Sequence, residues 1–268
     1  MTVALVGVGA DASNADPVAP LYDDGTFEFI PAPSPGGSGG TSERRTFGNT
    51  RLRHQDSVMG EFLESIKPLG DDGPDITGVN LNNWPLHYNP NFVSLTYGAT
   101  GEDEAFVEAL RSLEPGDGVA FYSVLEPEGG GAKHRYLIGY FAVEGVVDFQ
   151  ALDRDGGEAA FGDLSEPERR ALVEDHGENA YAKVYRETGE LPDGDDLVIV
   201  EGTDPGTMLS EAVQISEHGG GGHYYLTDDL QEGLSPEEGG DDKNAYLGGD
   251  HQAHVLDVSL EEFRDVVE

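Results

Sequence analysis

The stretch Leu113-Glu-Pro-Gly-Asp-Gly-Val-Ala-Phe-Tyr122, followed by Tyr136-Leu-Ile-Gly-Tyr-Phe-Ala-Val-Glu144, decides the fold. Pro115-Gly-Asp117 is a turn sequence, and the apolar residues after it predict a strand over Val119–Leu125. A second strand is expected over Tyr136–Phe149, after a turn-rich connection. Gly139 interrupts that strand, and a glycine inside a strand is typical of a bend. The two segments therefore predict a bent antiparallel hairpin.

The hairpin resembles the small β-barrels of the PUA-like group, which comprises PUA, ASCH, EVE and YTH domains. The shared features are the Pro-Gly-Asp turn that starts an apolar strand and the return strand bent at a glycine. The resemblance implies a barrel that binds RNA or a nucleobase carrying a modification. An ordinary structural hairpin is the alternative, because the same turn also starts strands in unrelated barrels.

The remaining pattern predicts a strand-rich α+β fold with a PUA-like β-barrel core, an N-terminal elaboration and peripheral helices. Helices are expected from apolar periodicity and from capping boxes, over 58–67, over Glu102–Leu113, after Ser165 and after Ser259. Strands are expected at Val3–Val8, Phe27–Ile30, Ala182–Tyr185 and Leu197–Val200. Periodicity leaves helix and strand equally open for Met208–Ile215.

We expect one domain over residues 1–268. Residues 1–100 form the N-terminal elaboration, which contains a Gly/Pro-rich loop at 31–40 and a group of arginines. Residues 101–230 form the PUA-like barrel region. Residues 231–268 form an acidic loop and a C-terminal helix.

The charge balance predicts a particular solvent. The chain has 53 acidic and 15 basic residues, for a formal net charge of −38. Self-repulsion of that size works against compactness, but molar salt shortens the Debye length to about 3 Å and screens it. With 11 Tyr and 11 Phe the chain is not of the disordered acidic type. We therefore expect a cytoplasmic protein of a salt-accumulating halophilic archaeon; an acidic partner-binding protein of a mesophile is the alternative.

The composition also excludes several classes of site. Cysteine is absent, so disulfides, thiolate chemistry and cysteine-based zinc sites are excluded. No apolar run approaches the ~20 residues of a membrane helix, so no membrane partner is expected. There is no phosphate-binding loop and no nucleophile elbow. The motifs therefore do not decide whether the protein is an enzyme, and they indicate no cofactor and no oligomeric state.

Four of the basic residues fall in one short stretch, Arg44, Arg45, Arg51 and Arg53. Guanidinium groups match phosphate oxygens bidentately, so this stretch is the candidate phosphate site. Pairing with acids of the same chain is the alternative. Phosphate contacts weaken as salt rises, so a halophilic reader of nucleotides should rely on stacking as well. Five aromatic residues are candidate walls of the site, with Trp84 and Tyr122 favoured over Tyr88, Phe92 and Tyr97.

Other polar residues are candidates for binding or acid/base roles. Asp11, Ser13 and Asn14 follow the first strand and could bind a ribose, a metal or a base edge; an Asx-turn is the alternative. His87 and His176 could act as acid, base or base-edge partner. Lys133-His134-Arg135 is a second basic spot that could touch a phosphate backbone. The pairs His218/His223 and His251/His254 are interpreted as solvated surface, so no metal site is expected.

Short motifs in order along the chain resemble the nucleotide modification associated domain family, third type. They are Gly9-Ala-Asp11-Ala-Ser13, Pro20-Leu-Tyr-Asp-Asp24-Gly25, Ile30-Pro31, His87-Tyr-Asn-Pro90, Leu95-Thr-Tyr-Gly98, Pro115-Gly-Asp117, Phe121-Tyr122, His176, Asn179-Ala-Tyr181 and Tyr225-Leu-Thr227. The chain departs from the family pattern at Val6-Gly7-Val8, where an Arg-Lys pair is usual, and at Asn89 and Asn91, which replace acids. The resemblance implies work on modified nucleotides, without a settled reaction.

We therefore expect recognition or processing of a modified nucleotide, free or in nucleic acid. The arginines would hold phosphate, aromatic residues near Trp84 and Tyr122 would stack the base, and His87, Asp11 or His176 would read its edge. A first alternative is a transferase or hydrolase acting on a base or sugar, in which Asp11, His87 and His176 would converge, with or without a metal. A second alternative is a scaffold subunit whose partner covers the arginines.

Overall fold

The computed structural model describes residues 1–11, 13–68, 74–101, 104–154, 157–192, 196–218, 224–228, 247 and 253–268. The helices are α1 (Met59–Phe62), α2 (Gly78–Asn83), α3 (Glu104–Arg111), α4 (Glu166–Asp175), α5 (Ala180–Thr188) and α7 (Leu260–Val267), with 3₁₀ turns η1 (Gly37–Gly39) and η2 (Phe161–Asp163). In the described part of the chain, no helix is both long and apolar enough to cross a membrane.

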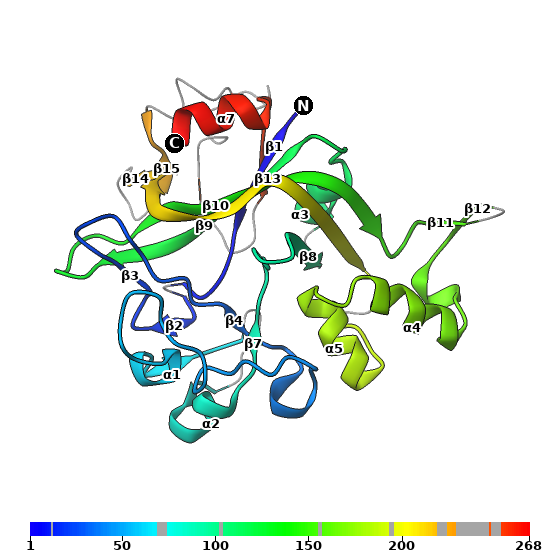
Figure 1. Ribbon diagram of the computed structural model, residues 1–268, viewed down its shortest axis with the longest axis horizontal. Helices are drawn as coiled ribbons and strands as arrows, with labels where there is room; N and C mark the ends of the chain where they lie inside the picture. The colour runs from blue at the N-terminus through cyan, green and yellow to red at the C-terminus, as the bar shows by residue number, and fades with distance from the viewer. Residues whose placement is uncertain are drawn as a thin grey trace.

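A seven-stranded sheet organises the chain. Its order is β16-β1-β9-β10-β13-β8, and β3 pairs with β9 beside this path. These strands are β1 (Val3–Gly7), β3 (Pro20–Leu21), β8 (Thr96–Thr100), β9 (Gly118–Pro127), β10 (His134–Asp148), β13 (Leu197–Gln214) and β16 (Ala253–Leu256). Figure 1 shows the long strands β9, β10 and β13 curled into an arch, so the sheet is a half-barrel. The fold is thus strand-rich with few helices; a closed PUA-like barrel stays a prediction.

The bent hairpin predicted from the sequence is present as β9 and β10. The two strands pair antiparallel, with a register shift between Leu137 and Gly139. A side chain at position 139 would collide with the ring of Phe92 and with the carbonyl oxygen of Thr207. Glycine therefore permits the sheet to bend where another segment packs closely on it.

The N-terminal segment fills the hollow of the arch. It contains the small sheets β2-β5-β6 and β4-β7, with strands β2 (Ala15–Asp16), β4 (Ala32–Pro33), β5 (Ser65–Ile66), β6 (Ile76–Thr77) and β7 (Leu86–His87). Aromatic rings join it to the sheet: the centroids of Phe29 and Phe92 are 6.2 Å apart, and those of Phe92 and Phe121 are 5.5 Å apart. This contact places the loops of residues 85–95 against the sheet.

Helices cover two further surfaces of the sheet. On one, α7 packs Leu260 and Phe263 against Leu5 and Tyr140. At the far end of β10 and β13, α4 and α5 enclose an apolar core with the hairpin of β11 (Leu152–Arg154) and β12 (Gly157–Ala159). Two further strands, β14 (Ser216–His218) and β15 (Tyr224–Leu226), pair antiparallel.

Several sequence expectations need correction. The segment Ala182–Tyr185 is helical, because Asn179 caps α5 through its side chain and Gly189 ends it in a left-handed conformation. Phe27–Ile30 is wholly buried and forms only one isolated bridge, at Phe27. The helix expected over 58–67 is the single turn α1. Met208–Ile215, left open, belongs mainly to β13.

Candidate functional site

A groove of about 400 Å³ opens where the α4–α5 turn meets the sheet. Its walls come from the turn itself, from residues 94–96 before β8, from Glu144 on β10 and from Glu201 on β13. The carboxylates of Glu144, Glu174, Asp175, Glu178 and Glu201, the imidazole of His176 and the guanidinium of Arg186 all line it. The groove is thus lined by residues with hydrogen-bond-accepting carboxylates, a guanidinium and an imidazole.

His176 and Glu201 form a hydrogen-bonded pair in this groove. His176 ends α4, and its Nδ1 lies 2.8 Å from Oε1 of Glu201 on β13. Only 11% of the histidine side chain is exposed, against 43% for the glutamate. In the neutral form of the imidazole, donation from Nδ1 to the carboxylate fixes the tautomer in which Nε2 is an acceptor. This pair is the arrangement in the groove best suited to reading a base edge or moving a proton.

Arg186 is the cation of the groove. It lies on α5, where Nη1 donates to Ser42 Oγ at 3.4 Å and Nη2 donates to the Gly177 carbonyl at 3.3 Å. Within the described ranges, no carboxylate forms an ion pair with it. An exposed guanidinium without a carboxylate is unusual in a chain of net charge −38. Sequence reasoning missed this residue because it stands alone inside a helical segment.

Asparagines hold the groove wall in place. The Asn89 side chain accepts from Gly98 N at 2.8 Å and donates to Gly98 O at 2.6 Å, which ties it to β8. Asn91 Nδ2 donates to the Glu178 carbonyl at 3.1 Å, and Asn179 Nδ2 donates to Thr96 Oγ1 at 3.1 Å. The segments around His87 and His176 are far apart in sequence. Both contact β8, and the hydrogen bond between Asn91 and Glu178 joins them directly.

The comparisons with known proteins identify the family. A family model described as "Nucleotide modification associated domain 3" matches residues 2–239. The chain belongs to this family. No curated protein and no solved structure matches it. The matched range contains the groove and the long hairpin, so the family ties this part of the chain to nucleotide modification.

His87 lies in the interior of the nucleotide modification associated domain, beside the groove wall. Its ring meets the Tyr181 ring edge-on, with centroids 4.7 Å apart. Burial, with the positive charge of Lys183, lowers the pKa of His87 from 6.5 to about 4. His87 is therefore neutral at neutral pH, and its position suits support of Tyr181.

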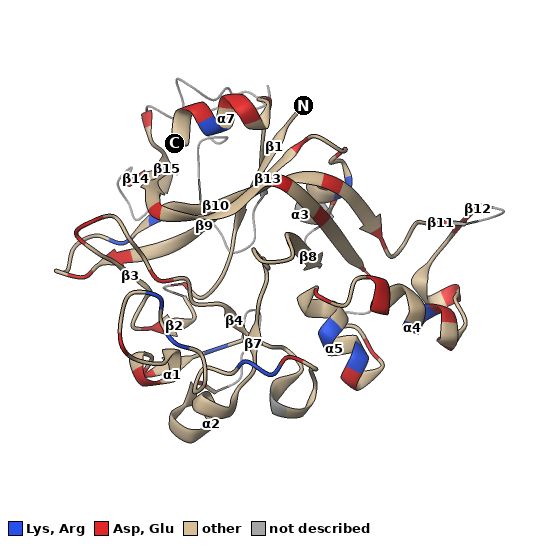
Figure 2. Ribbon diagram, viewed as in Figure 1, with Lys and Arg blue, Asp and Glu red and all other residues tan. Residues whose placement is uncertain are grey.

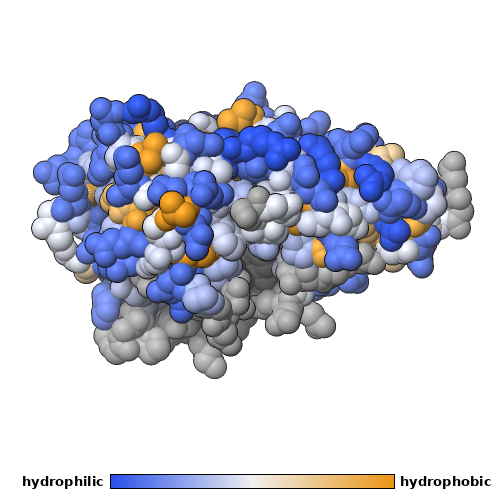
Figure 3. All heavy atoms as spheres, turned by 90° about the horizontal axis from the view of Figure 1, so that it is seen from below, coloured by the Kyte–Doolittle hydropathy of each residue, from blue (hydrophilic) through white to orange (hydrophobic). Residues whose placement is uncertain are grey.

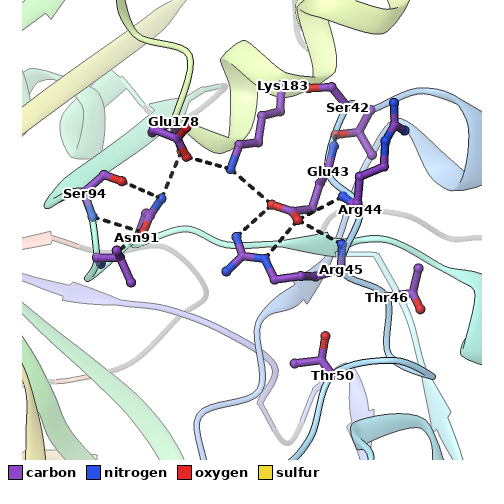
Figure 4. Close-up of polar contacts among 12 residues, drawn as sticks. Ser42, Glu43, Arg44, Arg45, Thr46, Thr50, Asn91, Ser94, Glu178 and Lys183 are labelled. Carbon is purple, nitrogen blue, oxygen red and sulfur yellow. Dashed lines mark hydrogen bonds and ion pairs between the residues drawn. The ribbon is translucent and has the colours of Figure 1, made fainter.

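Next to the groove, the carboxylate of Glu43 contacts the side chains of Arg45 and Lys183, as Figure 4 shows. Its carboxylate accepts from Arg45 Nε at 2.9 Å and Nη2 at 2.8 Å, and lies 3.1 Å from Lys183 Nζ. Burial raises the pKa of Glu43, but the hydrogen bonds from Arg45 and the charge of Lys183 outweigh it and lower the pKa to about 2. Lys183 also pairs with Glu178 in the groove at 3.4 Å.

The four arginines predicted to hold phosphate each contact a different residue, and phosphate binding by them stays a prediction. Arg44 pairs with Glu187 at 3.4 Å, and Arg45 pairs with Glu43 while lying 3.6 Å above the Tyr88 ring centroid. Arg51 pairs with Asp56. Arg53 lies against Met208 and the Phe27 ring. Figure 2 shows basic segments spread through the lower loops.

The other predicted site residues are spread through the domain. The Asp11 carboxylate accepts from Ser13 N and Oγ, and Asp11 N donates to Asn14 Oδ1, which closes an Asx-type turn. Among the described residues, no hydrogen bond or ion pair joins Asp11 to His87 or His176. A catalytic role for Asp11 stays a prediction.

Trp84 and Tyr122, the two aromatic residues favoured as candidates for stacking, pack against other parts of this domain. Trp84 Nε1 donates to the Ser34 carbonyl at 3.0 Å, and the indole packs 3.6 Å from the position of a Cβ at Gly37. It thus anchors the Gly/Pro-rich loop. Tyr122 is 5% exposed, in the core beneath α7. Stacking of a base by either residue stays a prediction.

The remaining histidines that the structure describes belong to no metal-binding group. In the part of the chain that the structure describes, no three His, Asp or Glu side chains are arranged to hold a metal ion. His223 and His251 lie outside the described residues. His254 is on β16, and burial with the charge of Arg135 lowers its pKa. His218 is exposed on β14.

Proposed function

We propose that this domain binds a modified nucleotide in the groove around His176, with its phosphate on Arg186. The observation that carries the proposal is the lack of an ion pair at Arg186 within the described residues. Arginine matches phosphate oxygens closely, and a single charge-assisted contact is stronger than a neutral hydrogen bond.

The rest of the groove suits a sugar and a base. Carboxylates accept hydrogen bonds, so the acidic lining fits ribose hydroxyls and the N–H groups of a base. Nε2 of His176 adds an acceptor beside them. The volume of about 400 Å³ falls within the usual range for small-molecule sites. Arg44, next to the same helix, is a candidate for a second phosphate.

Titration calorimetry tests this proposal. Wild-type protein in molar KCl is titrated with common nucleoside monophosphates and with nucleotides released from the nucleic acids of its host. Because the net charge of −38 is screened at that salt, we expect folded protein and measurable binding of a modified nucleotide in preference to its unmodified parent. Absence of binding to every nucleotide would contradict the proposal.

An enzyme acting on a nucleotide base or sugar is the second candidate, supported by the His176–Glu201 pair. A histidine oriented by a carboxylate can accept a proton from a substrate hydroxyl or amine. Mass spectrometry of nucleosides from a deletion strain and its parent tests this. A changed profile supports processing, and equal profiles support recognition alone.

A scaffold role has less support. Such a subunit would carry an apolar patch beside the arginines. Figure 3 shows the face seen from below the arch, where hydrophobic residues are scattered among hydrophilic ones. Val79, on α2, and Val93 are large hydrophobic residues with highly exposed side chains.

A further inference from the structure

An arginine and two histidines contact the ring of Tyr224 on β15. The guanidinium carbon of Arg135 lies 4.7 Å from the tyrosine ring centroid. The rings of His134 and His218 meet the same ring edge-on, with centroid distances of 5.8 Å and 5.2 Å. One arginine and two histidines thus contact a single aromatic ring in a strongly acidic chain.

Backbone contacts build this arrangement into the fold. The β14–β15 hairpin places His218 opposite Tyr224 and Ser216 opposite Leu226. Ser216 is fully buried; its Oγ accepts from Arg135 N at 2.8 Å, and Ile215 N donates to Arg135 O at 3.0 Å. The hairpin is therefore fixed to the start of β10, which carries His134 and Arg135. Tyr224 stays half-exposed.

The electrostatics of this surface differ from those of the chain as a whole. Arg135 has no ion pair with a carboxylate in the described ranges, and Lys133 next to it pairs with Glu126 at 3.4 Å. Among the described residues, the buried Nε2 of the nearby His254 has no hydrogen-bond partner. Its lowered pKa has burial as the first cause and the charge of Arg135 as the second. The guanidinium of Arg135 therefore has no ion pair with any acid that the structure describes.

We propose that Tyr224, Arg135, His134 and His218 form a contact surface for single-stranded nucleic acid, separate from the groove. A tyrosine with a guanidinium over its ring offers an aromatic surface for a base and a cation for a phosphate at the same place. Stacking keeps its strength at salt concentrations that screen a net charge of −38, whereas phosphate contacts alone fade. A platform that combines both suits an acidic protein better than a purely basic patch.

Fluorescence anisotropy with labelled oligouridine and oligothymidine in molar KCl tests this. Tyr224→Ala should weaken binding about tenfold, because stacking of a base on an aromatic ring contributes that much. Tyr224→Phe keeps the ring and should bind nearly as wild type, which separates stacking from a folding defect. Arg135→Gln should weaken binding severalfold. Glu217→Gln, between Ser216 and His218 on the hairpin, is the control and should not weaken it.

Three results would overturn the proposal. They are no binding of either oligonucleotide by wild type, binding by Tyr224→Ala as tight as by wild type, or displacement of the labelled strand by polyglutamate as readily as by unlabelled oligonucleotide. The last would identify a general anion or acidic-peptide surface. Nucleotide binding in the groove is measured on the same variants by calorimetry. Because the groove and this surface share no residue, Tyr224→Ala should leave that binding unchanged, and either proposal can fail alone.

Discussion

Lys183 Nζ on α5 lies 3.1 Å from Glu43 Oε2, and 11% and 8% of the two side chains are exposed. This ion pair fastens the loop of residues 41–45 to the helix that carries Arg186. Arg45 shares the same carboxylate and covers Tyr88. The network therefore links the loop after η1 to the groove, and Glu43 is its centre.

Glu43→Gln should lower the free energy of unfolding by about 3 kcal/mol, because it leaves the buried Lys183 with only the exposed Glu178 as an ion-pair partner and removes the carboxylate that pairs with Arg45. Urea denaturation in molar KCl measures this. Glu187→Gln, which breaks the exposed pair with Arg44, is the control and should cost no more than about 0.5 kcal/mol. Equal costs for the two variants would contradict a central role for Glu43.

The loss at Glu43 should also depend on pH. The folded pKa of about 2 lies below the ordinary 4.5, so the carboxylate contributes stability above pH 4.5 and loses it as the pH falls toward 2. The difference in unfolding free energy between wild type and Glu43→Gln should therefore shrink across that range. A difference that stays constant would show that the charge of Glu43 is not what stabilises the loop.

Protonation of His87 should destabilise the fold in a pH range above that of Glu43. Its folded pKa of about 4 lies below the unfolded 6.5, so the unfolded chain binds the proton more tightly and stability falls as the pH falls from 6.5 to 4. The loss is about 3 kcal/mol. His87→Phe keeps an aromatic edge for Tyr181 and should remove this part of the pH dependence. An unchanged profile would place the titration on another group.

Gly98→Ala should strain the groove wall. A Cβ there would lie 2.7 Å from Tyr181 Cδ2 and 3.0 Å from Asn179 Oδ1, so β8 and the α4–α5 turn would have to separate. Overpacking of this kind costs about 1–3 kcal/mol. Gly145→Ala on β10 is the control, because a Cβ there meets nothing within 4 Å. The two variants are compared by thermal unfolding; equal melting temperatures would contradict the tight contact.

His176→Gln should weaken nucleotide binding about tenfold, since it removes the acceptor Nε2 while keeping a polar side chain. Glu201→Gln leaves the imidazole but frees its tautomer, so a smaller loss of affinity is expected. If the protein is an enzyme, Glu201→Gln should lower kcat more than it raises KM. Calorimetry and turnover measurements distinguish these outcomes; unchanged affinity in both variants would exclude the pair from the site.

The sequence predicted the long hairpin and the capped helices because their signals are local. The Pro115-Gly-Asp117 turn, the bend at Gly139 and the Ser165 capping box each act within a few residues. The strand prediction at 182–185 failed because Val184 and Tyr185 suggested a strand more strongly than the cap at Asn179 suggested a helix. Tertiary packing of Ala182 and Tyr185 in the α4–α5 core decided the outcome.

The site was harder to predict because its partners are distant in sequence. Clustering of Arg44, Arg45, Arg51 and Arg53 along the chain could not reveal Glu187 as a partner 143 residues away. His176 was predicted as a candidate, but its pairing with Glu201 requires the fold. No motif marks Arg186 in the sequence. That it has no ion pair with a described carboxylate can be seen only in the three-dimensional structure.

Calorimetry of a matched pair of arginine variants tests the nucleotide site most directly. One variant changes Arg186 in the groove to Gln, and the other changes Arg170 on α4, which pairs with Glu166, to Gln. Each variant is titrated with a nucleotide that the wild type binds and with the nucleoside that lacks its phosphate. Wild type and Arg170→Gln should prefer the nucleotide, whereas Arg186→Gln should lose that preference. Arg186→Gln protein that still prefers the nucleotide as strongly as wild type would contradict the account.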